Sequence, residues 1–279
     1  MQKIRVAIST CPNDTFAFHG LLTGRVEIPG VEPEFELLDI EQLNAGMLGG
    51  RFDAAKVSFA AALEMADRVW VLPSGSALGF GVGPLLLSAK EGDVPSTADR
   101  LILCPGEHTT ANLLFRLFYP QCTRVEQVVF SEIMPRLRSG AADFGVCIHE
   151  GRFTWREQGV HCVEDLGQRW EQTTDTPLPL GGIVVRRDVP TDVALALQTA
   201  LRRSLQLALA DPDAALPTMR RYAQEFDDRV LMQHVELYVN VWTLDLGQEG
   251  HAALQQLGRL YRTATGRSVG ALEVLPSPD

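Results

Sequence analysis

The sequence is short of positive charge. Among 279 residues, 25 are Lys or Arg and 35 are Asp or Glu, which gives a formal net charge of −10, and only three residues are lysines. Nucleic acids and anionic membranes are bound by basic faces. The composition therefore excludes both as expected partners. Positive charge for an acidic ligand has to be local.

Cysteine pairs and long apolar runs are also lacking. The five cysteines are odd in number and show no C-x-x-C spacing, so neither a disulfide framework nor a metal site is expected. No apolar stretch approaches the length of a membrane span, and Met1 runs into a strand without an apolar signal region. We expect a cytoplasmic protein. With 46% hydrophobic residues it can form one long domain or two ordinary ones.

A short apolar strand ends at a histidine. Residues 144–148 form a buried-type run between Asp143 and Gly151, and His149 follows directly. Ligands bind beyond the carboxyl ends of strands in open α/β sheets. Imidazole exchanges protons near neutral pH, because its ordinary pKa is about 6.5. His149 is thus a candidate base, although a histidine that only bonds a backbone carbonyl would give the same pattern.

The first segment predicts a strand over residues 4–9, a loop over 10–15 and a helix over 16–22. Asn13, Asp14 and Thr15 are all residue types that cap helices. Capping alone explains their types, but three candidates for one cap favour a role in binding. The amides of this turn would face the space beyond the strand, where an anion can bind.

Further elements follow, and the plan then repeats. A strand over 31–38 and a helix over 41–48 precede a strand that ends at Lys56, Val57 and Ser58. Lys56 is either a solvated charge or a ligand contact. From residue 100 the order recurs: a strand over 101–104, a capping loop with Thr109 and Thr110, a helix over 111–119, a strand over 124–130 and a helix over 131–137. Aligning the two copies places Phe59 opposite His149.

Two glycine- and proline-marked segments, 79–88 and 177–185, predict crossings between two α/β lobes. We expect lobe 1 to comprise residues 1–87 plus 180–279 and lobe 2 residues 88–179, with a hinge and a cleft between them. Ordinary strands flanked by turns are the alternative. Helices are predicted over 192–209, 213–222, 228–241 and 249–265. His234 and His251 are expected to be structural or exposed, and Phe226, Tyr238 and Trp242 to be core residues.

Two strings carry a family resemblance over essentially the whole chain. Cys-Pro-Asn-Asp-Thr-Phe at 11–16 and His-Glu-Gly-Arg-Phe-Thr at 149–154 resemble the 1,4-dihydroxy-6-naphthoate synthase family of the futalosine route to menaquinone. The resemblance implies a type II periplasmic-binding-protein-like α/β fold, with two mixed sheets flanked by helices. It implies a carbon–carbon lyase, without cofactor or metal, that converts cyclic dehypoxanthinylfutalosine to 1,4-dihydroxy-6-naphthoate.

The same resemblance implies roles for particular residues. His149 matches the proton acceptor, and the substrate contacts fall at Lys56, Val57, Ser58, Thr109 and Thr110. Asn13 and Asp14 are added from their place in the first loop, where shaping that loop is the alternative. The substrate is a small anion whose carboxylate is expected at the start of the helix after Thr109 and Thr110.

Other functions remain open from the sequence. Cleavage that leaves an aromatic ring needs a base with a near-neutral pKa, which His149 supplies; Glu150 and Asp14 are the next candidates. The alternatives are chorismate dehydratase of the same route and a non-catalytic binding protein for a small carboxylate. The sequence leaves a monomer and a homodimer equally open.

Overall fold

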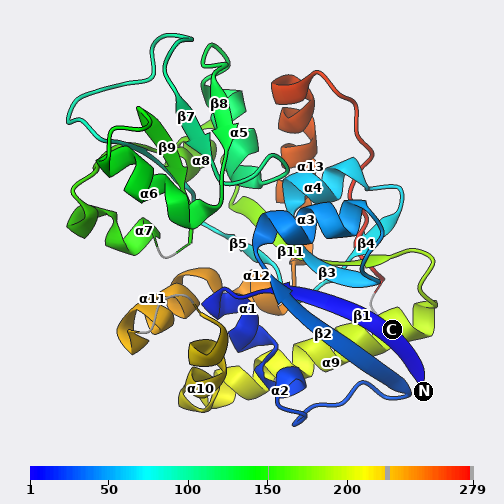
Figure 1. Ribbon diagram of the computed structural model, residues 1–279. Coiled ribbons are helices and arrows are strands. Elements are labelled where there is room, and N and C mark those ends of the chain that lie inside the picture. The colour runs from blue at the N-terminus through cyan, green and yellow to red at the C-terminus, as the bar shows by residue number, and fades with distance from the viewer. Residues whose placement is uncertain (150, 224–226, 277–279) are drawn as a thin grey trace.

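The computed structural model describes residues 1–149, 151–223 and 227–276, and its strands form two mixed sheets flanked by helices (Figure 1). The first sheet has the order β2 (Val31–Leu38), β1 (Gln2–Ser9), β3 (Ala54–Ser58), β11 (Leu178–Arg186) and β4 (Val69–Val71), and β5 (Ala77–Gly79) also pairs with β11. The second has the order β10 (His161–Asp165), β6 (Leu85–Ser88), β9 (Phe144–Cys147), β7 (Ile102–Cys104) and β8 (Val125–Gln127).

The helices surround these sheets in two groups. In Figure 1, α5 to α8 lie around the second sheet at the upper left, and α1, α2, α9, α10 and α11 lie below the first. Their bounds are α1 (Pro12–Ala17), α2 (His19–Leu22), α3 (Ile40–Leu48), α4 (Phe59–Glu64), α5 (Thr110–Phe118), α6 (Phe130–Arg138), α7 (Gly151–Thr154), α8 (Leu166–Thr174), α9 (Thr191–Ala210), α10 (Pro212–Tyr222), α11 (Asp228–Tyr238), α12 (Val241–Leu244) and α13 (Gly247–Thr265). No helix in the described part of the chain is long and apolar enough to cross a membrane.

The repeat predicted from element order is confirmed by the topology. In the first sheet β1 pairs in parallel with β2 and β3, and β11 runs antiparallel to β3. In the second, β7 pairs in parallel with β8 and β9, and β6 runs antiparallel to β9. The chain passes from β5 of the first sheet to β6 of the second, and returns through α8 to β11. The lobe boundaries that we gave above stay a prediction.

Burial of apolar faces holds the helices on the sheets. One core lies between the first sheet and α1, α2 and α9, and includes Ile8, Phe18 and Leu201. A second core, with Phe59 and Trp170, runs from the other face of the first sheet to the second sheet. Each fully buried side chain of this size contributes about 1.5–3 kcal/mol. Phe59 is thus a core residue of α4, although it aligns with His149 in the repeat.

Two predicted helix boundaries are wrong. Helix α1 begins at Pro12 rather than Phe16, so Asn13, Asp14 and Thr15 lie within its first turns and do not cap it; Cys11 is the N-cap. Proline at the first helical position has its φ preset for a helix, which explains the early start. The helix predicted over 228–241 ends at Tyr238, because Asn240 caps the separate helix α12 through a capping box.

Glycine is required where the crossing segment meets the start of α8. A Cβ on Gly83 would lie 2.2 Å from the Gly167 Cα. The Arg152 guanidinium fixes this approach, since it donates to the Gly83 carbonyl at 2.6 Å and pairs with Asp165 at 2.6 Å. The neighbour of the missing Cβ is backbone, so it cannot move aside as a side chain would.

Gly83→Ala should therefore lower the free energy of unfolding by about 1–3 kcal/mol, the usual cost of overpacking. Gly258→Ala is the matched control, because a Cβ at this position in α13 would meet the Leu63 side chain at an ordinary 3.5 Å. It should stabilise the protein by roughly 0.5–1 kcal/mol. Denaturant unfolding measures both changes, and equal effects would contradict the close approach.

Candidate active site

A cleft lies between the two sheets. Ligand sites are commonly clefts lined by apolar side chains and a few polar groups. The cleft collects the carboxyl ends of β1 and β3, the start of α5, the residues after β9 and one face of α11. Its lining residues are Ser9, Cys11, Asn13, Asp14, Ile40, Lys56, Ser58, Ala77, Val82, Gly83, Pro84, Thr109, Thr110, Ala111, Ile148, His149, Leu180, Gly181, His234 and Tyr238.

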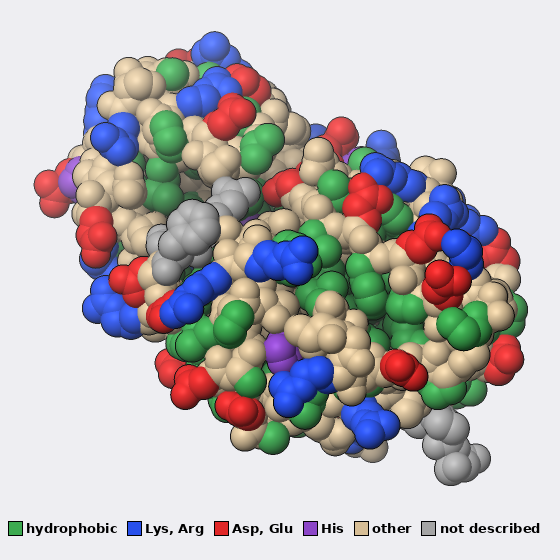
Figure 2. All heavy atoms as spheres, turned by 60° about the horizontal axis from the view of Figure 1, so that its bottom comes forward, with side chains coloured by type: hydrophobic (Ala, Val, Ile, Leu, Met, Phe, Trp, Pro, Cys, Tyr) green, Lys and Arg blue, Asp and Glu red, His purple; other side chains and the backbone are tan. Residues whose placement is uncertain are grey.

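Of the eight residues assigned to the catalytic or substrate-binding site from the sequence, all but one line this cleft. The exception is Val57, whose side chain belongs to the apolar core. Successive side chains of a strand point to opposite faces, so Lys56 and Ser58 face the cleft while Val57 faces away from it. Charged side chains of both signs are interspersed over the face of the molecule shown in Figure 2.

Lys56 and Asp14 form a buried ion pair. The Lys56 Nζ lies 2.5 Å from the Asp14 Oδ1, and each side chain is 5% exposed. Asp14 also accepts hydrogen bonds from the Ser9 hydroxyl at 2.5 Å and the Asn13 amide at 3.0 Å, and Lys56 donates to the Gly75 carbonyl. Lys56 is therefore not a solvated surface charge. The buried Asp14 carboxylate thus has several hydrogen-bond donors. A buried charge needs such partners to offset its loss of hydration.

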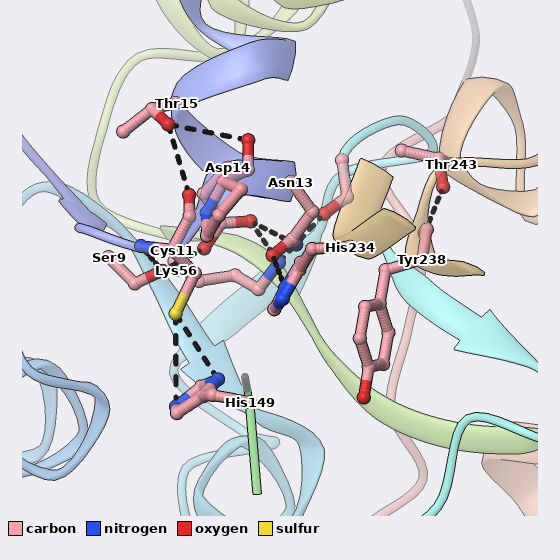
Figure 3. Close-up of polar contacts among 12 residues, drawn as sticks. Ser9, Cys11, Asn13, Asp14, Thr15, Lys56, His149, His234, Tyr238 and Thr243 are labelled. Carbon is pink, nitrogen blue, oxygen red and sulfur yellow. Dashed lines mark hydrogen bonds and ion pairs between the residues drawn. The ribbon is translucent and has the colours of Figure 1, made fainter. Parts of the chain in front are cut away.

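Asn13 connects this pair to His234 on α11. The Asn13 Oδ1 lies 3.0 Å from the His234 Nε2. His234 is 1% exposed, and burial lowers its pKa well below the ordinary value, with His149 and Lys56 nearby lowering it further. The imidazole of His234 is therefore neutral at neutral pH. Figure 3 shows Lys56, Asp14, Asn13 and His234 gathered on one side of the cleft.

His149 lies across the cleft from this group, beside the Cys11 thiol (Figure 3). The Cys11 Sγ is 3.2 Å from Nδ1 and 3.8 Å from Nε2 of His149. The His149 ring packs at 4.8 Å on Phe130 and stacks at 6.5 Å from the ring of His234. Its reactive nitrogens thus face the same space as the buried network.

The backbone at His149 adopts an unfavourable conformation, with φ of 56°. Among the described non-glycine residues only Asp175 shares a positive φ. A non-glycine residue in this left-handed region costs of the order of 1–3 kcal/mol, and such residues concentrate at functional sites. This backbone conformation indicates that the surroundings impose the position of the imidazole. A histidine that only ended a strand would not need a left-handed backbone.

Thr110 ties the second sheet to the first, and Thr109 caps the start of α5. The Thr110 hydroxyl donates to the Leu180 carbonyl at 2.7 Å and accepts from the Ala60 amide at 3.3 Å. The Thr109 hydroxyl donates to the Gly106 carbonyl and caps α5 by accepting from the Asn112 amide. Both hydroxyls are thus engaged with protein groups. The amides of the first turn of α5 are the donors that remain for a carboxylate.

Glu41 makes a second tie between the sheets. From α3 it accepts two bonds of 3.2 Å from the His108 amide in the loop before α5. Asn44 donates to Glu41 and also brackets Ser58, whose amide bonds the Asn44 Oδ1 at 2.8 Å. Burial raises the pKa of Glu41, and the two donors act in the opposite direction. The Ser58 end of β3 is therefore held against the loop before α5.

Sequence reasoning missed four polar or aromatic residues of the cleft: Ser9, Cys11, His234 and Tyr238. Cys11 begins the quoted motif and Ser9 lies two residues before it, but neither received a role. His234 and Tyr238 were expected outside the site, yet their rings lie 4.5 Å apart on the cleft face of α11. The spacing of four places them on one side of a helix, and this was the available signal. Glu150 and Phe226 lie outside the described residues.

The comparisons with known proteins first define the class. The chain has the fold of the periplasmic binding proteins: the aliphatic sulphonate binding protein of Escherichia coli superposes with a TM-score of 0.67 over 100% of this chain and 94% of its own, at 13% identity. A solved protein of Archaeoglobus fulgidus gives a TM-score of 0.88 at 31% identity, over 95% of this chain and 98% of its own. The predicted fold class is confirmed.

The chain belongs to the menaquinone biosynthesis family, whose model matches residues 4–263. It is 43% identical to a 1,4-dihydroxy-6-naphtoate synthase of Thermus thermophilus over all of this chain and 98% of the relative. It is 42% identical to the enzyme of that name in Streptomyces coelicolor, over 96% of this chain and 95% of the relative. The resemblance in the two strings is thereby confirmed, and the relatives are enzymes. Among the described residues no group of three or more His, Cys, Asp or Glu side chains is placed to hold a metal.

Proposed function

We propose that this protein is a carbon–carbon lyase that converts cyclic dehypoxanthinylfutalosine to 1,4-dihydroxy-6-naphthoate, with His149 as the general base. The observation that carries the proposal is the imidazole of His149, which lies in the cleft on a left-handed backbone, beside Cys11 and opposite a buried polar network. A binding protein needs no such base. The names of the 42–43% identical relatives support the same reaction.

The chemistry asked of the site is modest. A base removes a proton from the bound substrate, a carbon–carbon bond breaks, and the aromaticity of the ring that forms drives the step. His149 takes the proton, and general-base assistance of this kind contributes about 10²–10⁴-fold. The ties from Thr110 and Glu41 hold the second sheet against the first, which supports exclusion of water from the reacting carbon.

We further propose that the lobes, residues 1–87 plus 180–279 and residues 88–179, open to admit the substrate and close by these ties. The substrate carboxylate binds at the start of α5, where the amides of Thr110 and Ala111 form the first turn and Ala111 lines the cleft. A helix start favours an anion through its amides and its dipole. Lys56 and Asp14 border the same cleft and position the substrate there.

The direct test is to incubate the purified protein with cyclic dehypoxanthinylfutalosine and identify the product by mass spectrometry. We expect 1,4-dihydroxy-6-naphthoate together with the sugar-derived fragment. Conversion of chorismate instead would make the protein a chorismate dehydratase. Tight binding of a small carboxylate with no turnover of either compound would make it a binding protein, an outcome that its fold allows.

Thr110→Val tests the carboxylate position. The variant leaves the Leu180 carbonyl without its donor, so the free energy of unfolding should fall by about 1–3 kcal/mol. Affinity for the product should fall too, because the first turn of α5 is no longer fixed against Leu180. Thr110→Ser keeps the hydroxyl and should preserve both properties. If calorimetry found unchanged product affinity for Thr110→Val, the carboxylate would have to sit elsewhere in the cleft.

A further inference from the structure

The mechanism above gives no role to His234, although this residue is 1% exposed and lines the cleft. It lies on α11 with its ring 6.5 Å from that of His149 and nearly parallel to it, at 23°. A ligand that approaches the nitrogens of His149 therefore also comes close to His234. The ring of Tyr238, four residues further along α11, lies 4.5 Å from that of His234.

The hydrogen-bond network fixes which nitrogen of His234 carries the proton. The Asp14 carboxylate, paired with Lys56, accepts hydrogen bonds, so the Asn13 amide nitrogen must face it at 3.0 Å. The Asn13 Oδ1 then faces the Nε2 of His234 at 3.0 Å. Because an amide oxygen only accepts, the Nε2 must donate. The proton of the neutral ring thus lies on Nε2.

The other nitrogen is left as an unused acceptor. The Nδ1 of His234 is buried and has no hydrogen-bond partner among the described residues. Buried polar atoms in folded proteins are almost always paired, so each exception needs a reason. Protonation of Nδ1 is not available as the reason, since burial and the neighbouring Lys56 and His149 lower the pKa of this histidine well below its ordinary value. Nδ1 is therefore left for a donor that the described residues do not supply.

We propose that His234 is a substrate-binding residue whose Nδ1 accepts a hydrogen bond from a hydroxyl group of the bound substrate. This inference rests on the proposed function, which supplies a substrate with a hydroxyl-bearing, sugar-derived part. Asp14 acts at a distance in this arrangement: it orients Asn13, and Asn13 sets the tautomer of His234. The pair of His149 and His234 then defines where the substrate lies, the first as base and the second as acceptor.

Two substitutions separate binding through Nδ1 from support of the fold through Nε2. The amide of Gln branches one carbon further out than that of Asn, so Gln reproduces the Nε2 position and Asn the Nδ1 position. His234→Gln keeps a donor for Asn13 and loses the acceptor, whereas His234→Asn keeps the acceptor and loses the bond to Asn13. His234→Gln should therefore lose mainly substrate affinity, and His234→Asn mainly stability.

Substrate affinity is measured by calorimetry in the His149→Asn background, in which turnover is expected to be about 10²–10⁴-fold slower. His234→Gln should weaken substrate binding by roughly three- to tenfold, the effect of one lost hydrogen bond between neutral groups. His234→Asn should lose less affinity and more thermal stability. Equal affinity of the Gln variant and its parent would overturn the inference. Failure of the unmutated protein to convert the substrate would instead count against the proposed function.

A second measurement keeps His234 itself and so does not depend on how well the His234 variants fold. Nitrogen NMR of the histidines in the His149→Asn protein should show His234 neutral, with its proton on Nε2. Saturation with substrate should move the His234 Nδ1 resonance in the direction of a nitrogen that accepts a hydrogen bond. An unmoved Nδ1 resonance at saturation, or a proton on Nδ1 in the free protein, would refute the proposal.

Discussion

His149→Asn should reduce turnover of cyclic dehypoxanthinylfutalosine by about 10²–10⁴-fold, the usual contribution of a positioned general base. The side chain of Asn has no basic nitrogen, so the proton must pass to water. Asn is also among the residues that best tolerate the left-handed backbone, in which His149 has φ of 56°. The melting temperature should therefore stay close to that of the parent. Single-turnover kinetics measures the loss directly, without the effect of product release.

The control for this variant is His251→Asn, because His251 is exposed on α13 and is not among the residues that line the cleft. It should turn over substrate at the parental rate. A near-parental rate for His149→Asn would make His149 a structural residue and require another base. The next candidates would be Glu150 and Asp14.

Asp14→Asn should lower the free energy of unfolding by about 3–5 kcal/mol, because it leaves the buried Lys56 ammonium without a counter-charge. The substituted side chain has the same shape, so lost packing contributes little. Lys56→Met should cost a similar amount for the converse reason. The double variant Asp14→Asn with Lys56→Met should be more stable than the sum of the single changes predicts, since it leaves no unpaired charge.

The exposed pair of Lys3 and Glu34 provides the matched control. Its nitrogen and oxygen lie 3.3 Å apart, but the side chains are 65% and 56% exposed. Lys3→Met should change the free energy of unfolding by less than about 1 kcal/mol, as surface ion pairs do. Urea unfolding of the parent and the four variants measures these changes in the free energy of unfolding. If Asp14→Asn changed the free energy of unfolding by less than about 1 kcal/mol, either water reaches the Lys56 side chain or its amine carries no charge.

The local sequence pattern predicted most of the helices and strands of this fold. The strands over 31–38 and 102–104 and the long helices α9 and α13 follow from apolar periodicity and from glycine, proline and aspartate at their ends. The repeat was visible in the order of elements, and the topology of both sheets confirms it. The start of α1 was missed, because Asn13, Asp14 and Thr15 are good caps and the proline before them was the stronger signal.

The sequence by itself determined the class of protein, the family and the candidate base, since these depend on composition and on two short strings. It also predicted seven of the twenty residues that line the cleft. Only the tertiary structure decided what these residues contact. The bonds from Asn13 to His234 and from Cys11 to His149 join positions 221 and 138 apart, and Lys56 meets Asp14 across 42. Such pairs are set by the packing of α11 and the residues after β9 against α1, and no local periodicity records them. The role of His234 depends on such contacts.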